Sequence, residues 1–104
     1  MEGTMINSAA YWEDMNGKCV DIAFFDIGSG LAEVKAVDDG GIYIQWICMS
    51  PCYSCQVVDE STYTEKKYYP FDLIAELYSA VVIPQPDIQR KRMEYMEAEM
   101  SQLV

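Results

Sequence analysis

The chain has 104 residues, with 17 acidic and 7 basic side chains and no histidine, so its formal net charge at pH 7 is −10. A chain of this length builds one domain, because two halves could not each bury enough apolar surface to offset their conformational entropy. The lack of histidine removes the usual general base and the Ser-His and Cys-His nucleophile pairs, and no glycine-rich phosphate loop with its lysine occurs. We therefore expect a protein that is not an enzyme.

The negative charge is concentrated in residues 1–86, which hold 13 of the acidic and 4 of the basic side chains. An acidic surface repels phosphate backbones, so we expect no direct nucleic-acid binding. The charge then indicates either basic protein surfaces as partners or simply a contribution to solubility. No apolar run reaches the ~18 residues of a membrane span, and the first residues lack the basic region and apolar core of a signal peptide. The sequence thus predicts a cytoplasmic protein with reduced cysteines and no membrane contact.

One helix signal is followed by five strand signals. Residues 7–17 predict a helix of about two turns, with Asn7 or Ser8 as the N-cap and Asn16-Gly17 as a left-handed stop. Apolar alternation and turn residues then predict strands at residues 18–27, 31–37, 42–49, 68–69 and 77–83. The turns between them are predicted at residues 26–30, at 38–41 with the hairpin sequence Asp-Asp-Gly-Gly, and at 70–72 with Pro-Phe-Asp.

The third predicted strand has apolar side chains on both of its faces. One face carries Ile42, Ile44, Trp46 and Cys48, and the other carries Tyr43, Gln45, Ile47 and Met49. A strand of this kind is covered on both sides. We expect the second cover to be a helix or another subunit.

The order of these signals resembles that of the Sm-like fold. The segments that carry the resemblance are the first helix, N-G-K-x-V-x-I, V-D-D-G, the alternating aliphatic strand and Y-Y-P-F-D-L-I-A-E-L, which together span residues 7–83. The resemblance implies a mainly β (α+β) fold, a five-stranded SH3-like barrel preceded by a helix, and assembly into rings by edge-strand pairing. It does not extend to RNA binding, because the family's Asn after Asp38 or Asp39 and its Arg-Gly or Lys-Gly pair are missing.

The C-terminal segment predicts an amphipathic helix at residues 87–104, following a barrel domain at residues 1–86. Its apolar seam consists of Met93, Met96, Met100 and Leu103. Basic residues lie near the positive end of this helix and acidic residues near its negative end, so the isolated helix should be weak. Antiparallel pairing with a second copy would bury both seams, which favours a homo-oligomer; the alternative is that the helix folds back onto its own barrel.

The cysteine-rich stretch C-M-S-P-C-Y-S-C spans residues 48–55. Its spacing resembles the cluster motif of radical SAM enzymes, but those enzymes need a large (β/α) barrel, and Tyr53 here follows the second cysteine instead of preceding the third. A structural zinc ion is the better alternative, with Cys48, Cys52, Cys55 and Cys19 as its ligands. We expect free thiols and no cofactor.

Size and composition are similar to those of accessory proteins of bacteriophages and mobile elements, including inhibitors of host defence. Two mechanisms fit such a protein in a host cytoplasm. The first is sequestration of a signalling nucleotide between subunits, with stacking by Tyr43, Trp46, Tyr68 and Tyr69 and phosphate binding by Lys35, Lys66, Lys67 and Arg90 to Arg92. The second is an acidic decoy for a nucleic-acid-binding enzyme, with contacts from Asp21, Asp26, Glu33, Asp38, Asp39, Asp59 and Glu60.

Two other functions remain open from the sequence. One is a structural ring or assembly module of Sm-like type that does not bind RNA. The other is an interaction domain stabilised by zinc. For ligand or partner binding we single out the four aromatic side chains named above together with Asp38, Asp39, Lys66 and Lys67.

Overall fold

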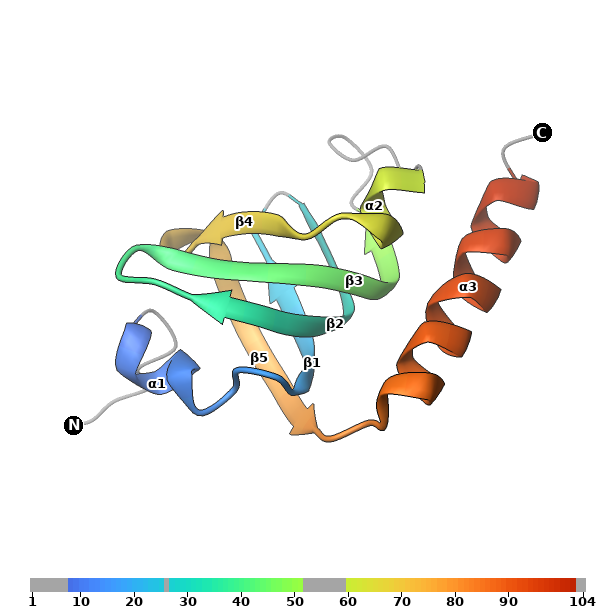
Figure 1. The fold of residues 1–104 in the computed structure, drawn as a ribbon. Coiled ribbons are helices and arrows are strands. Elements are labelled where there is room, and N and C mark those ends of the chain that lie inside the picture. Colours follow the sequence, from blue (N-terminus) through green and yellow to red (C-terminus); the bar gives the residue numbers. More distant parts are fainter. Residues whose placement is uncertain (1–7, 26, 52–59, 103–104) are drawn as a thin grey trace.

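The computed structural model describes residues 8–25, 27–51 and 60–102 (Figure 1). Its elements in chain order are α1 (Ala9–Glu13), β1 (Cys19–Phe24), β2 (Gly28–Val37), β3 (Gly41–Pro51), α2 (Glu60–Thr64), β4 (Lys67–Pro70), the 3-10 turn η1 (Phe71–Leu73), β5 (Ile74–Val81) and α3 (Gln85–Gln102). The predicted mainly β fold with an N-terminal and a C-terminal helix is therefore confirmed. In the part of the chain that the structure describes, no helix is long and apolar enough to span a membrane.

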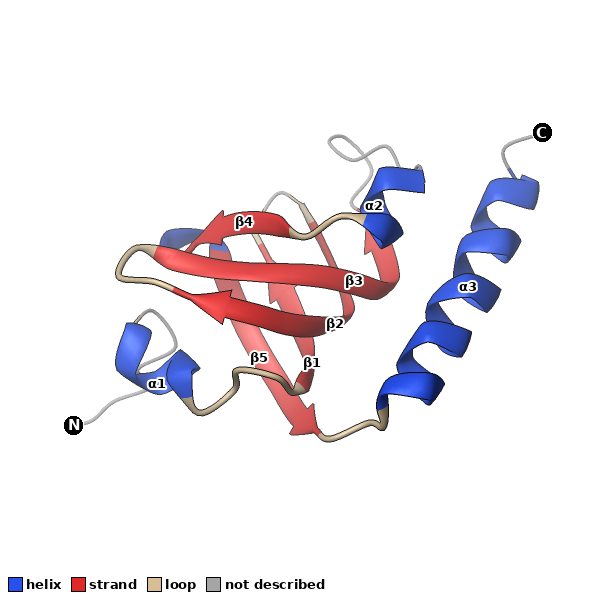
Figure 2. Ribbon diagram, viewed as in Figure 1, coloured by secondary structure: helices blue, strands red, loops and turns tan. Residues whose placement is uncertain are grey.

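The strands form one antiparallel sheet in the order β4-β3-β2-β1-β5 (Figure 2). β4 and β5 are its two edges, and the described residues show no pairing between them, so the sheet is open. It is nevertheless strongly curled, because Phe24 of β1 packs on Tyr69 of β4 with ring centroids 4.5 Å apart, although two strands separate β1 from β4 in the sheet order. The curl encloses the main core.

The N-terminal helix starts where the sequence places it, but it ends at Glu13, and the left-handed residue Gly17 closes the turns that follow. The Ser8 hydroxyl accepts a hydrogen bond from the Tyr11 amide at 3.3 Å, which satisfies a free first-turn donor. Gly17 has φ = 85°, a left-handed conformation that favours glycine, and its amide donates to the Val34 carbonyl at 2.9 Å. Between these ends, Trp12 is fully buried, so α1 closes one side of the core.

The glycines at positions 28 and 30 lie within β2, which corrects the predicted turn at residues 26–30. They pair across the ladder with Phe24 and Ile22 of β1. A Cβ atom on Gly30 would collide with the Cys48 carbonyl oxygen of β3, and Gly30 has φ = 151°. The glycine thus serves a close approach between neighbouring strands, which turn chemistry alone does not reveal.

The predicted two-sided third strand is confirmed, but its alternation breaks at a register shift. Trp46 pairs with Ala32 and Cys48 with Leu31, so Ile47 is the extra residue on β3. Met49 therefore takes the place in the main core that alternation assigns to Cys48. Cys48 instead packs with Ile47 in a second, smaller cluster on the other face of the strand.

The helix α3 supplies the cover for that second face. It stands beside the end of β3 and next to α2 (Figure 1), and its Ile88 is buried against Cys19 and Ile47. Of the two arrangements expected for the C-terminal helix, the structure has the one in which it folds back onto its own sheet. This packing brings the basic half of the helix close to the strands.

The helix α3 begins at Gln85, two residues before its predicted start. The elements β5 and α2 differ more from the prediction. β5 starts at Ile74, three residues early, because register shifts in its pairing with β1 interrupt the period-2 pattern that locates a strand. It also ends at Val81, after which Val82 is 76% exposed. The helix α2, predicted as a polar connection, forms around Tyr63, whose side chain is fully buried.

Candidate functional site

Tyr43 and Tyr68 lie side by side on the outer surface of the sheet, near one of its edges. They are direct partners in the β3–β4 ladder, and their ring centroids are 4.9 Å apart with an angle of 55° between the ring planes. Tyr43 is half-buried and Tyr68 is 41% exposed. Together with Lys66 and Asp38, described next, they form a surface that we call the tyrosine face.

The β2–β3 hairpin positions the acidic member of the tyrosine face. The Asp38 carboxylate accepts hydrogen bonds from the Gly40 and Gly41 amides at 2.8 and 2.9 Å, as its place in a hairpin turn predicts. The Tyr68 hydroxyl donates to the same oxygen at 3.3 Å. Partial burial, followed by the nearby Asp38 carboxylate, raises the pKa of Tyr68, so its hydroxyl stays protonated and serves as a donor.

Glycine at position 41 makes room for the Tyr68 ring. A Cβ atom there would lie 2.9 Å from Cζ of Tyr68 and would also collide with the Tyr69 carbonyl oxygen. The hairpin glycines therefore serve two purposes, the turn itself and the approach of an aromatic ring from β4.

Lys66 supplies the positive charge of the tyrosine face. Its Nζ lies 5.7 Å from the centroid of the Tyr43 ring, within the range of a cation–π contact. The neighbouring Lys67 points elsewhere and donates to the Ser61 hydroxyl at 3.3 Å. Lys66 and Lys67 were both predicted to bind phosphate, and the structure places Lys66 beside the tyrosines.

Trp46 and Tyr69, the other two aromatic residues of the predicted ligand set, belong to the main core. Trp46 is fully buried and Tyr69 is 7% exposed. The Trp46 indole donates to the Tyr69 hydroxyl at 3.2 Å, which satisfies both polar groups inside the core. These side chains stabilise the fold and present no ring face on which a ligand can stack.

The predicted acidic contact set is dispersed. Asp21, Asp38 and Asp39 are exposed, whereas Glu33 is buried inside the protein. Asp26 and Asp59 lie outside the described residues, as does the side chain of Glu60. Because Glu33 is buried, it cannot belong to an acidic surface that contacts a partner.

Glu33 forms a buried ion pair with Arg92 of α3, a contact that sequence reasoning missed. Nη2 of Arg92 lies 3.2 Å from the Glu33 carboxylate, and both side chains are 4% exposed. Nε of Arg92 donates to the Trp46 carbonyl oxygen at 2.8 Å, beside the register shift of β3. Arg92 was predicted as a phosphate-binding surface cation; instead it anchors α3 to β2 and β3.

Three polar groups hold Glu33 in its charged form. Burial by itself would raise the pKa of Glu33, but hydrogen bonds from Gln85 and Arg92 and the charge of Lys35 outweigh it and hold that pKa below its ordinary value of 4.5. Gln85 donates to the carboxylate at 2.9 Å, and Lys35 lies 3.4 Å from it. The one available sequence signal was the spacing of Ile88, Arg92 and Tyr95 on a single helix face.

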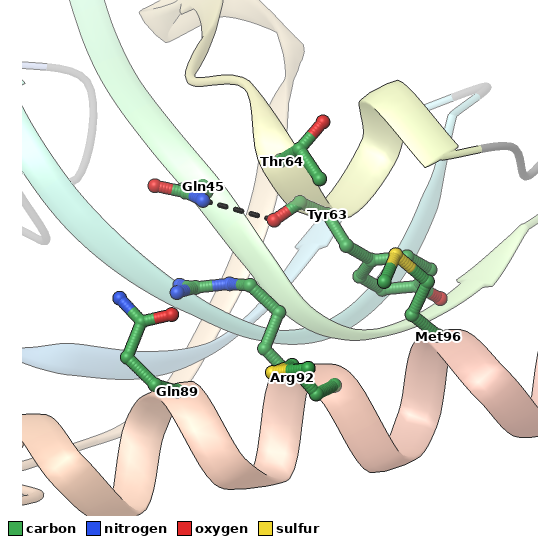
Figure 3. A pocket seen from close by; sticks show the side chains of 7 residues that line it. Gln45, Tyr63, Thr64, Gln89, Arg92 and Met96 are labelled. Atoms are coloured by element: carbon green, nitrogen blue, oxygen red, sulfur yellow. Dashed lines mark hydrogen bonds between the residues drawn. The ribbon is translucent and has the colours of Figure 1, made fainter.

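A cavity of about 430 Å³ lies where β3, α2 and α3 meet (Figure 3). Its lining consists of Gln45, Tyr63, Thr64, Gln89, Arg92, Met93 and Met96. The Gln45 side-chain amide donates to the Tyr63 carbonyl oxygen at 2.9 Å, which ties β3 to α2 at the cavity wall. The site could not be read from the sequence, because α2 was not predicted.

The methionine seam of α3 is divided between two environments. Met96 is half-buried against the main core, whereas Met93 is 57% exposed. The side chain of Met100 and the whole of Leu103 lie outside the described residues. The proposed pairing of seams between two copies therefore stays a prediction.

Cys19 and Cys48 are free thiols in the second core cluster. Burial raises the pKa of both thiols, so little thiolate is present at neutral pH. Cys52 and Cys55 lie outside the described residues. Within the described ranges, no group of three or more acidic or cysteine side chains is placed to hold a metal ion, and the zinc alternative remains a prediction.

Comparison with known proteins gives no match to a protein family, to a curated protein or to a solved structure. The function must therefore be argued from the geometry of the chain itself.

Proposed function

We propose that this protein is a non-enzymatic binding protein that sequesters a small nucleotide on its tyrosine face. The observation that carries the proposal is the surface pairing of Tyr43 with Tyr68 beside a lysine. An exposed aromatic ring is a stacking platform for a nucleobase, and each such contact contributes about 1–3 kcal/mol. Tyr68 is the more exposed of the two rings and is the expected platform.

The charges of the tyrosine face limit which nucleotides fit. Lys66 is the cation placed over the Tyr43 ring, and the Asp38 carboxylate accepts a hydrogen bond from the Tyr68 hydroxyl. The tyrosine face offers one lysine, and the protein has a net charge of −10, so a triphosphate would meet more repulsion than attraction. We therefore propose a ligand with one negative charge for each base, such as a cyclic mononucleotide or cyclic dinucleotide.

Size and acidic composition support a biological setting, in which the protein is an accessory inhibitor of host defence from a phage or mobile element. Sequestration of a signalling nucleotide is a direct way to act as such an inhibitor. The acidic decoy is less well supported, because its predicted contact set has lost Glu33 to the interior.

Calorimetric titration with a panel of cyclic mononucleotides and dinucleotides tests this proposal. Tyr68→Ala is expected to weaken the binding of the best ligand by about 5-fold to 150-fold, which corresponds to the loss of one stacking contact. Lys66→Ala should weaken it as well, and more so at low salt.

Tyr78→Ala is the matched control, because Tyr78 is a 59% exposed tyrosine on β5, the opposite edge strand. It should leave the affinity unchanged. If no nucleotide of the panel binds, or if the two tyrosine variants weaken binding equally, the tyrosine face is not a nucleotide site.

A second candidate function, an assembly module that pairs edge strands, is favoured by the two unpaired edges β4 and β5 of the described sheet. Tyr78, Val81 and Val82 are exposed on or just after β5, and an edge of this kind is a template for another chain. Pairing of β4 in one copy with β5 in the next would join copies head to tail, which gives a ring when the rotation between copies closes. Light scattering is expected to give a multiple of 11.8 kDa, whereas a monomer mass would contradict this function.

A further inference from the structure

We propose that the cavity between β3, α2 and α3, which we call the α3 cavity, is a second binding site that takes a small molecule with a carboxylate head and an apolar body. It shares no residue with the tyrosine face. Its volume of about 430 Å³ falls within the range of about 300–1,000 Å³ that is usual for small-molecule sites. The proposal does not depend on nucleotide binding.

The polar anchor of the α3 cavity is Arg92. Its side chain is 4% exposed and extends from α3 toward the strand that carries Gln45 (Figure 3). Nε and Nη2 are engaged by the Trp46 carbonyl and the Glu33 carboxylate. Nη1 is also buried, yet it makes no hydrogen bond with any residue that the structure describes.

An unpaired buried donor on a charged group is unfavourable, because it has lost its hydrogen bonds with water and gains none in the protein. Native proteins rarely leave such a donor without a role. Because Arg92 is one of the residues that line the cavity, the unpaired donor points to an acceptor supplied by a ligand. Glu33 and Trp46 already hold the Arg92 guanidinium in place before a ligand binds. Such preorganisation keeps the entropic cost of binding low.

The surrounding charges favour a carboxylate over other acceptors. Glu33 balances one positive charge, but Lys35 and Arg92 both lie next to it. Within this group of three side chains, two positive charges face one negative charge, which suits an anion. The net charge of −10 on the whole protein disfavours anions with several charges, so a single carboxylate fits better than a phosphate.

The remaining walls suit an apolar body. Tyr63 contributes a buried ring, and Met93 and Met96 contribute flexible thioether side chains that adapt to the shape of a ligand. Gln89, which is exposed, lies at the mouth of the cavity. An aromatic or branched aliphatic carboxylate would place its body against the methionines and its oxygens on Nη1 of Arg92.

A titration with 1-naphthoate, followed by NMR of methionine methyl groups labelled with carbon-13, tests the proposal on the full chain. The Met93 and Met96 methyl resonances are expected to shift together, while that of Met15, which packs beside α1, stays in place. The matched neutral probe 1-naphthamide should bind at least about 10-fold more weakly, since it lacks the charge-assisted hydrogen bond to Arg92.

Two variants on α3 locate the site without disturbing Arg92. Gln89→Trp should block the mouth of the cavity and abolish the shift of Met96, whereas Glu94→Trp, at an exposed position of the same helix outside the lining, should bind 1-naphthoate as the unaltered protein does. Equal affinity for the acid and the amide would overturn the assignment of the carboxylate. The absence of Met93 and Met96 shifts with both probes would overturn the site itself.

Discussion

Replacing Glu33 with alanine is expected to lower the free energy of unfolding by about 3–5 kcal/mol, a large part of the stability of a small domain. The variant leaves the Arg92 guanidinium buried with no opposing charge and removes the acceptor of Gln85. Urea unfolding followed by tryptophan fluorescence measures the change, since both tryptophans are fully buried in the native state. A loss below about 0.5 kcal/mol, typical of a surface substitution, would contradict the buried ion pair.

The control for this experiment is Lys35→Ala, which removes a partner of Glu33 that is 34% exposed and should have an effect below about 1 kcal/mol. The pH dependence of the free energy of unfolding is an independent test of the ion pair. Because the pKa of Glu33 is lowered on folding, its contribution is complete above pH 4.5 and is lost as the pH falls through the lower native value. As the pH is lowered from 4.5 to strongly acid conditions, the free energy of unfolding of Glu33→Gln should therefore decrease less than that of the unaltered protein.

Replacing Trp46 with alanine is expected to lower the free energy of unfolding by about 3–5 kcal/mol. The substitution leaves a cavity beside Phe24, whose ring meets the indole edge-to-face at 5.8 Å, and it deprives the Tyr69 hydroxyl of its partner. Thermal or urea unfolding of the variant measures the loss. An unchanged free energy of unfolding would contradict the core position of Trp46 and favour the predicted role in ligand stacking.

Tyr68→Ala is the matched control for Trp46→Ala, because Tyr68 is an aromatic residue of the same sheet that is 41% exposed. Its effect on stability should be near 1 kcal/mol, the value expected for one cross-strand aromatic pair. Trp46→Phe separates the two contributions of the indole, since it keeps most of the volume but removes the donor to Tyr69.

The candidate sites were predictable only where a local rule applied. Tyr68 and Tyr69 are neighbours on one strand, so strand periodicity already places their side chains on opposite faces. That rule excludes a common site for the two rings, but it does not say which ring enters the core. The curl of the sheet decides this, because it brings Tyr69 against Phe24 and leaves Tyr68 outside beside Tyr43.

The sequence by itself determined the features whose causes lie within a few residues: the Ser8 cap, the left-handed turn at Gly17, the Asp38 hairpin and the two-sided character of β3. Short-range hydrogen bonds and side-chain periodicity are enough to specify them. The tertiary structure alone decided the rest. The Glu33–Arg92 pair joins residues 59 positions apart, and the α3 cavity needs α2, β3 and α3 at once. Such contacts depend on how the elements pack, which no local pattern encodes.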